Sequence, residues 1–168
     1  MADVMTILEK KKKLKGLKIV FVGDCENNVT HSLALLSDKL GMKFVSCSPK
    51  GFEMKREVVK MLKNRPVEIQ NPKEAVKNAD VIITDTWVSM GDESQKKKRL
   101  KIFPPYQVNA KLMGLAKKNA IFMHCLPAYR GYEVTDEVID GPQSVVFDEA
   151  ENRLHVQKAL MLYILTSK

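Results

Sequence analysis

Short apolar runs alternate with amphipathic segments along most of this chain. Each run is bounded by polar or glycine residues, which is typical of strands that are buried on both faces. The runs that we expect to form strands are residues 18–22, 43–47, 81–84, 120–123 and 144–147, with 68–70 as a shorter extended piece. This pattern predicts a parallel sheet that is covered by helices on both sides.

Helical periodicity fills the intervals between these runs, because apolar residues recur there three or four positions apart. The expected helices lie within residues 1–16, 29–40, 54–62, 72–78, 93–101, 112–116, 135–139 and 156–163, where 93–101 could also be a charged loop. Crossovers between parallel strands are right-handed, so the loops that follow the strands share one edge of the sheet. We expect an α/β fold: a three-layer, Rossmann-like, doubly wound sheet of about five parallel strands in the order 3-2-1-4-5.

The first expected helix differs from the others because it precedes every strand. Its apolar residues are Met1, Val4, Met5 and Leu8. Lysines at 10–13 and 15 follow them, where they suit the negative end of a helix, and Gly16 ends it. We expect its apolar stripe either to pack against something that this chain does not contain or to drive self-association.

Composition places the chain among globular proteins with one domain. It has 168 residues, of which 45% are hydrophobic and 29% are charged, and this is enough for a substantial core. No apolar stretch approaches the roughly 20 residues that a bilayer-spanning helix needs. The lysines near the N-terminus follow a short apolar turn, an order that does not fit a secretory signal. We therefore expect no membrane partner.

The net charge of +8 raises the question of nucleic-acid binding. Much of the excess lies in two runs, residues 10–13 and 96–99, and neither run is interleaved with aromatic residues. Solvated helix ends or loops explain such runs better than a nucleic-acid surface does. We expect no nucleic-acid partner, whereas the positive field favours a substrate with phosphate or carboxylate groups.

Motifs for cofactors and metals are missing from the sequence. The first expected strand is followed by GDCENN at residues 23–28 instead of G-x-G-x-x-G, and there is no P-loop. Cys25, Cys47 and Cys125 form no CxxC pair, and the histidines lack zinc spacing. An odd number of unpaired cysteines indicates reduced thiols and a cytoplasmic protein. We expect neither an organic cofactor nor a metal ion.

Polar side chains follow three of the expected strands. Residues 24–28 follow the first strand, residues 85–91 follow a second, and His124-Cys125-Leu126-Pro127 ends a third. Such strand ends meet at the edge of a parallel sheet where ligands bind, so we expect them to form one site. A cysteine at that edge can be a nucleophile, a proton acceptor, a metal ligand or only a small buried apolar residue.

The segments at these strand ends together resemble the ornithine carbamoyltransferase family. They are Val22-Gly23-Asp24 with Asn27-Asn28 and His31-Ser32, then DTWVSMG at 85–91, then MHCLP at 123–127. Further matches are PYQVN at 105–109, GYEVTDEVIDG at 131–141 and ENR at 151–153. The resemblance implies transfer of the carbamoyl group of carbamoyl phosphate to the δ-amine of L-ornithine. The products are citrulline and phosphate, in arginine metabolism, and no cofactor is needed.

The resemblance also implies a domain that is missing here. The family has a carbamoyl-phosphate domain with Ser-x-Arg-Thr and His-Pro-x-Gln segments, and neither segment occurs in this sequence. We expect residues 1–16 to be a remnant of the interdomain helix and residues 17–168 to be the ornithine-binding α/β domain. The whole family member is expected to be a homotrimer or a higher oligomer. This chain alone is expected to be a monomer that is inactive or nearly so.

Roles for individual residues follow from the resemblance. The residues implied to bind ornithine are Asn28, Asp85, Ser89 and Met90, and those implied to bind carbamoyl phosphate are His124, Cys125, Leu126 and Arg153. Cys125, with Asp85, is implied to be catalytic, the thiol accepting a proton from the δ-amine. Leu126 is implied to act through its carbonyl and to precede a cis bond to Pro127.

The residue types by themselves allow structural alternatives. Asn28 also suits the cap of the helix that begins near Val29, and Asp85 suits a cap or a salt bridge to a lysine. His124 could be a satisfied buried histidine, and Arg153 an exposed arginine. Three functional alternatives stay open: a binding module for a separate carbamoyl-phosphate domain, a carbamoyltransferase with another amine substrate, and a nucleic-acid binder.

Overall fold

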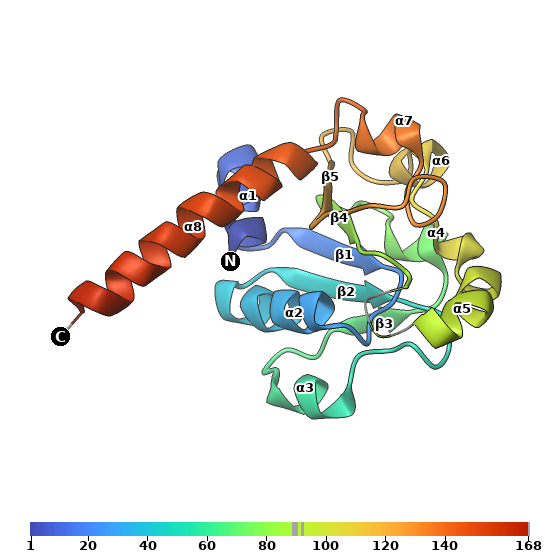
Figure 1. The fold of residues 1–168 in the computed structure, drawn as a ribbon, viewed down its shortest axis with the longest axis horizontal. Coiled ribbons are helices and arrows are strands. Elements are labelled where there is room, and N and C mark those ends of the chain that lie inside the picture. The colour runs from blue at the N-terminus through green and yellow to red at the C-terminus, as the bar shows by residue number, and fades with distance from the viewer. Residues whose placement is uncertain (89–90, 92, 168) are drawn as a thin grey trace.

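The parallel sheet expected from the sequence is confirmed by the computed structural model, which describes residues 1–88, 91 and 93–167. Its strands lie in the order β3-β2-β1-β4-β5, and every neighbouring pair is parallel (Figure 1). The strands are β1 (Lys18–Val22), β2 (Lys43–Cys47), β3 (Val67–Ile69), β4 (Val81–Thr84) and β5 (Ile121–His124). The register places Val20 of β1 between Val45 of β2 and Ile82 of β4.

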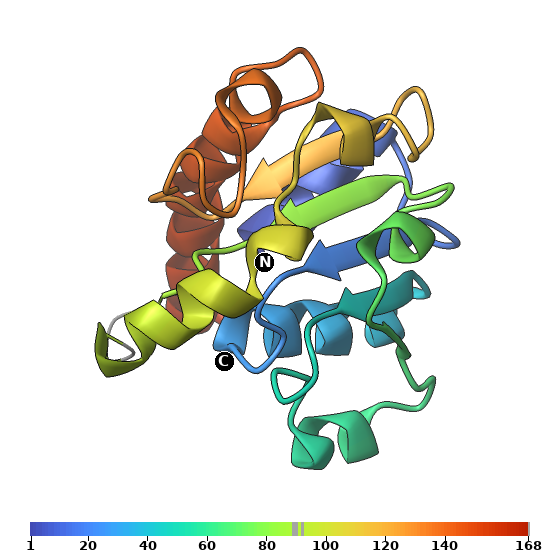
Figure 2. The same ribbon diagram turned by 90° about the vertical axis from the view of Figure 1, so that its right-hand side faces the viewer.

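Helices connect these strands and cover the sheet. The α-helices are α1 (Ala2–Lys11), α2 (Asn28–Leu40), α3 (Arg56–Met61), α4 (Pro72–Ala75), α5 (Lys96–Ile102), α6 (Ala110–Met113), α7 (Asp136–Ile139) and α8 (Val146–Thr166). Short 3-10 helices occur at η1 (Glu93–Gln95) and η2 (Pro104–Tyr106). Figures 1 and 2 both place α3 (teal) near the β3 edge of the sheet and α7 (orange) near the β5 edge.

Two apolar cores lie on opposite faces of the sheet, because successive residues of a strand point to opposite sides. One core joins the strand residues Val20, Ile82 and Phe122 to Ala75, Phe103, Leu112 and Val138. The other joins Ile19, Val81 and Ile121 to Ile7, Leu33 and Val145. Burial on both faces explains why the strands are continuous apolar runs in the sequence.

The expected strand at residues 144–147 is wrong. Ser144 forms an isolated bridge with Phe122, and α8 begins two residues later at Val146. Asp148 and Glu149 lie in the first turn of α8, where carboxylates interact favourably with the positive end of the helix. The order 3-2-1-4-5 holds with the short extended piece, now β3, as the third strand.

The first helix packs within this chain by a face other than the stripe that the sequence predicted. Ile7 of α1 is fully buried, whereas Met1 and Leu8 of that stripe are exposed. Asn152 of α8 donates from Nδ2 to Thr6 Oγ1 at 2.9 Å and to Glu9 Oε2 at 2.7 Å. These contacts hold α1 against the first half of α8 (Figure 1).

The second half of α8 carries a large exposed apolar surface and extends beyond the sheet in Figure 1. The exposed large side chains of this half are Leu160, Met161, Leu162, Tyr163, Ile164 and Leu165. A contiguous exposed surface of this kind is typical of an interaction site. In the part of the chain that the structure describes, no helix is both long enough and apolar enough to cross a bilayer.

The cap of α2 gives a stability test with a matched control. Asn27 Oδ1 accepts a hydrogen bond from Thr30 N at 2.8 Å, whereas Asn28 is the first helical residue. We expect Asn27→Ala to lower the free energy of unfolding by about 1 kcal/mol, because a donor at the helix start loses its partner. We expect Asn28→Ala to stay within about 0.5 kcal/mol of wild type. Urea unfolding followed by circular dichroism measures both values, and the reverse ranking would contradict this cap.

Candidate functional site

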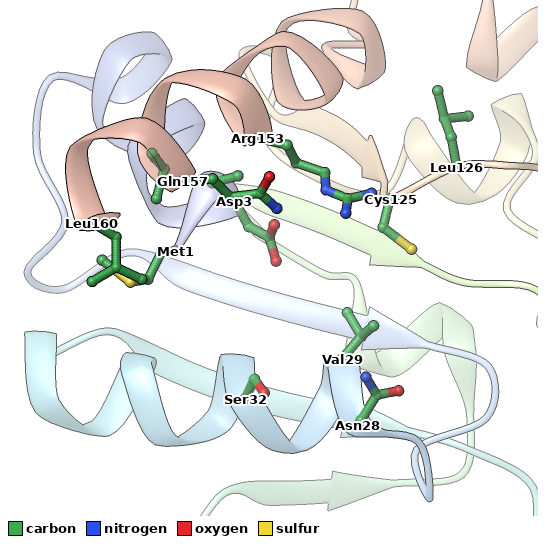
Figure 3. A pocket seen from close by; sticks show the side chains of 12 residues that line it. Met1, Asp3, Asn28, Val29, Ser32, Cys125, Leu126, Arg153, Gln157 and Leu160 are labelled. Carbon is green, nitrogen blue, oxygen red and sulfur yellow. The ribbon is translucent and has the colours of Figure 1, made fainter. Parts of the chain in front are cut away.

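One cavity of about 420 Å³ brings together side chains from distant parts of the sequence (Figure 3). Asn28 comes from α2, Cys125 and Leu126 follow β5, and Arg153 comes from α8. Asp3 near the start of α1 completes the wall beneath α8. The strand ends therefore meet at one rim, as the parallel sheet requires.

Asn28 faces this cavity and does not cap α2. The capping role that the sequence left open belongs to its neighbour Asn27. Asn28 is exposed, and in Figure 3 its side chain lies across the cavity from Arg153. Its amide group is thus placed where it can donate to a ligand.

Cys125 and Asp85 form a hydrogen-bonded pair at the end of β4 and β5. The Cys125 thiol donates to Asp85 Oδ1 at 3.3 Å, and the same oxygen accepts from Thr86 N at 2.7 Å. Asp85 is buried, and no lysine or arginine among the described residues forms an ion pair with it. The alternative of a salt bridge to a lysine is therefore wrong for this structure.

Burial controls the protonation of this pair. Burial raises the pKa of the Cys125 thiol well above its usual range, and the negative charge of Asp85 raises it further. Burial also raises the pKa of Asp85, although the hydrogen bond from Thr86 N opposes this effect. At neutral pH the thiol is consequently protonated and donates to the carboxylate. The sequence left the thiol state open, and these shifts favour the protonated thiol.

His124 is fully buried and does not line the cavity. Its Nδ1 accepts a hydrogen bond from Leu126 N at 2.9 Å, so its Nε2 carries the proton and lies 3.3 Å from Glu133 Oε1. Leu126 has a φ of 53°, and its bond to Pro127 is cis, as the resemblance implied. In this structure His124 matches the structural alternative, a buried histidine with both nitrogens satisfied.

Two glutamates near the site are buried, which the sequence did not predict. Glu133 is fully buried, and its Oε1 also accepts from Tyr129 N at 2.5 Å. Glu149 of α8 accepts a hydrogen bond from His124 N at 3.1 Å. Burial, together with the neighbouring Asp3, raises the pKa of Glu149 to about 8. A glutamate in a polar run gives no sign of burial, so only the fold could identify these two.

Arg153 presents a cation to the cavity. It lies on the second turn of α8 and is exposed, and Figure 3 shows its guanidinium directed toward Cys125. It makes no ion pair with any residue in the described ranges. An unpaired guanidinium beside a polar cavity is suited to an anionic or carbonyl oxygen.

Ser89 and Met90 lie outside the described residues. The chain is described up to Val88 and again at Gly91, whose φ is 95°. The roles implied for Ser89 and Met90 therefore stay predictions.

Asp85, His124 and Cys125 each offer one ligand atom, and these atoms lie within 4.8 Å of one another. Zinc accepts such donors. However, both ring nitrogens of His124 form hydrogen bonds within the protein, and the Cys125 thiol donates a hydrogen bond to Asp85. The geometry is that of a hydrogen-bonded cluster, and the expectation of no metal stays a prediction.

Alkylation of Cys125 tests the electrostatics of the pair. Only the thiolate reacts with iodoacetamide. Because the charge of Asp85 raises the thiol pKa, Asp85→Asn is expected to lower it and to speed alkylation of Cys125 at pH 8. The gain is roughly tenfold for each unit by which the pKa falls. Mass spectrometry gives the rate, with the buried Cys25 and Cys47 as internal controls. An unchanged or slower rate in the variant would contradict the pairing.

Comparison with known proteins agrees with this arrangement of residues. A family model described as "Aspartate/ornithine carbamoyltransferase, Asp/Orn binding domain" matches residues 15–164. The ornithine carbamoyltransferase of Caldicellulosiruptor saccharolyticus is 56% identical over 170 residues, which cover 97% of this chain and 55% of that protein. That of Hyperthermus butylicus is 53% identical over 172 residues, which cover 98% of this chain and 55% of the relative.

Solved structures show the same relationship. The ornithine carbamoyltransferase of Pyrococcus furiosus superposes with a TM-score of 0.88 at 51% identity, over 95% of this chain and 53% of that one. The Thermus thermophilus structure gives a TM-score of 0.88 at 39% identity, over 98% of this chain and 54% of that one. This chain thus spans about half the length of the relatives that it matches. Through its match to the Asp/Orn-binding domain, the chain belongs to the aspartate/ornithine carbamoyltransferase family.

Proposed function

We propose that this chain is the L-ornithine-binding half of a carbamoyltransferase. The whole reaction moves the carbamoyl group of carbamoyl phosphate to the δ-amine of ornithine and gives citrulline and phosphate. One observation carries the proposal: the amide of Asn28, the thiol of Cys125 and the guanidinium of Arg153 line one cavity. Asp85 does not line this cavity, but its buried carboxylate accepts the hydrogen bond of the Cys125 thiol.

The polar groups of the site match those of ornithine. The α-carboxylate needs N–H donors, and the amide of Asn28 can supply them. The ammonium groups need an acceptor that is already desolvated, and the buried carboxylate of Asp85 can supply it. Ser89 and Met90 are proposed to contact the amino-acid end, because the Ser89-Met90-Gly91 run favours ornithine over another amine.

The δ-ammonium must lose a proton before it attacks, because only the free amine has a lone pair. The Cys125 thiol already holds its proton and donates to Asp85. Within the pair, the carboxylate is therefore the group that can accept a further proton. We assign proton acceptance to the Asp85–Cys125 pair, in which the carboxylate takes the proton and the thiol stays hydrogen-bonded beside it. This modifies the acceptor role expected of Cys125 alone.

Arg153 and Leu126 are proposed to serve carbamoyl phosphate. The guanidinium of Arg153 suits its phosphate or carbonyl oxygens. The carbonyl of Leu126 is proposed to accept a hydrogen bond from the carbamoyl NH₂ group. His124 does not line the cavity, and its ring accepts a hydrogen bond from Leu126 N. We therefore propose that His124 positions the Leu126 carbonyl and does not itself contact the carbamoyl group.

The carbamoyl-phosphate domain is proposed to complete the site. Residues 1–16 are then the interdomain helix, and residues 17–168 are the ornithine-binding domain. The match of the domain model from residue 15 onward supports this division. The complete assembly is proposed to be a homotrimer or larger, and this chain alone a monomer. The three free cysteines support a reducing, cytoplasmic setting.

A second candidate function is a binding module that associates with a separately supplied carbamoyl-phosphate domain. The exposed apolar residues 160–165 of α8 favour it, since such a surface on a single domain indicates a protein partner. If light scattering on a mixture of the two pieces shows no complex, this candidate is contradicted.

Ornithine titration tests the proposed substrate. We expect calorimetry to show that wild type binds L-ornithine and that Asp85→Ala loses about 1.5–3 kcal/mol of affinity, roughly 10- to 100-fold, because a hydrogen bond to a charge is lost. Glu57→Ala removes an exposed carboxylate on α3 and is the control that should match wild type. Equal heats from wild type and Asp85→Ala would remove the proposed role of Asp85.

The isolated chain is expected to form negligible citrulline from ornithine and carbamoyl phosphate. Holding two reactants in near-attack geometry supplies about 7–11 kcal/mol of barrier reduction, and this chain carries groups for only part of that task. A colorimetric citrulline assay on the pure chain measures this. Citrulline that forms with the wild-type chain and disappears with Asp85→Ala would refute the expectation.

A further inference from the structure

A buried ion pair next to the cavity ties several loops together at the same edge of the sheet. Arg99 of α5 pairs with Asp24 at the end of β1, and both side chains are 5% exposed. Arg99 Nη1 also donates to the carbonyl oxygen of Trp87 at 3.0 Å. Its guanidinium carbon lies 5.0 Å from the centre of the Phe52 ring. The assignments given above use none of these residues.

Asp24 divides its two carboxylate oxygens between Arg99 and the turn that leads into α2. Oδ2 accepts from Arg99, and Oδ1 accepts from Glu26 N at 2.9 Å. Thr30, in the first turn of α2, donates from Oγ1 to the carbonyl of Asp24 at 3.4 Å. Asp24 thereby fixes the start of α2, where Asn28 lies.

Arg99 holds the backbone that follows Asp85, on the opposite side of the site from α2. Its hydrogen bond to Trp87 O joins the two ends of the segment from residue 87 to residue 99. Trp87 also stacks on Phe103, with ring centres 5.7 Å apart and an interplanar angle of 23°. Because Trp87 follows Asp85 by two residues, the ion pair links the backbone beside Asp85 to the turn that carries Asn28.

Stability alone does not explain a pair of this kind. Desolvation of two charges largely offsets their attraction, and apolar side chains of similar volume often replace a buried ion pair without loss. The pair also borders a polar cavity of about 460 Å³, which is lined by Asp24, Asn28 and Arg99 among others. Asn28 lines both this cavity and the first one.

We infer that Asp24 and Arg99 are positioning residues for the amino-acid end of the substrate. Their ion pair holds Asn28 at a fixed place relative to the segment that follows Asp85. This placement decides whether one ligand can reach an amide donor and a carboxylate at the same time. The inference rests on the proposed function and deepens it, because it concerns the same site.

The test compares wild type with Asp24→Asn, Arg99→Gln and Arg99→Lys. Asp24→Asn is nearly isosteric, and its side-chain oxygen can still accept from Glu26 N. Lys101→Gln is the matched control, because Lys101 is exposed on the same helix and the variant loses the same charge. Circular dichroism first confirms folding. Calorimetry and the fluorescence of Trp87, the single tryptophan of the chain, then follow titration with L-ornithine and with 1,4-diaminobutane, which lacks the α-carboxylate.

We expect Asp24→Asn and Arg99→Gln to bind L-ornithine about tenfold more weakly than wild type, because the ligand must then order the site. Binding of 1,4-diaminobutane should not change, and Arg99→Lys should recover part of the loss. Lys101→Gln should behave as wild type.

Other results separate the two proposals. Equal affinity for L-ornithine in wild type and Asp24→Asn would overturn the positioning role and leave the proposed function intact. Equal losses for both ligands would assign the pair a general structural role and also overturn it. A wild-type chain that binds neither ligand would overturn both proposals. If Arg99→Gln does not fold, the comparison of wild type with Asp24→Asn decides the matter.

Discussion

The site depends on one constraint, which is that β1, β4 and β5 run parallel to one another. Under that constraint every strand ends at the same edge of the sheet. Asp24, Asp85 and His124 come at or directly after these ends, so their loops have to meet. The apolar runs themselves are buried in two cores and offer no chemistry. Packing therefore fixes the frame, and the first residues beyond each strand supply the polar groups.

Burial gives these polar groups properties that they would lack on the surface. The low dielectric around Cys125 keeps the thiol protonated, and the hydrogen bond to Asp85 then has a defined direction. Glu149 has its pKa raised to about 8 by burial beside Asp3, and it still accepts from His124 N. The backbone on either side of Cys125 is held from both directions, by Glu149 at His124 N and by His124 itself at Leu126 N. A thiol held in this way needs little reorganisation when a ligand binds.

The local pattern of apolar and polar residues predicted most strands and helices and the polar strand ends. It could not predict which side chains of different elements contact one another. The strand ends at residues 24, 85 and 124 were predictable because apolar runs and their polar successors are local signals. The run at 144–147 misled because its β-branched residues resemble a strand, while the carboxylates that follow favour a helix start. Asn27, and not Asn28, caps α2, and the sequence could not distinguish them because both neighbours are asparagines. Glu133 lies 9 residues from His124 across a loop, and Asp24 lies 75 residues from Arg99, so no spacing rule could reveal either partner.

The charged side chains of the site differ in whether they have partners within this chain. The carboxylates of Asp85 and Asp24 are buried and have donors within the chain. Arg153 is exposed, and in the described ranges no carboxylate pairs with it. The same helix carries Arg153 near its start and the exposed apolar residues 160–165 near its end. Because one continuous helix connects them, a partner that binds the exposed residues 160–165 would contact the same helix that carries Arg153. The carbamoyl-phosphate domain that we propose as this partner would thus meet the helix that carries the proposed phosphate ligand.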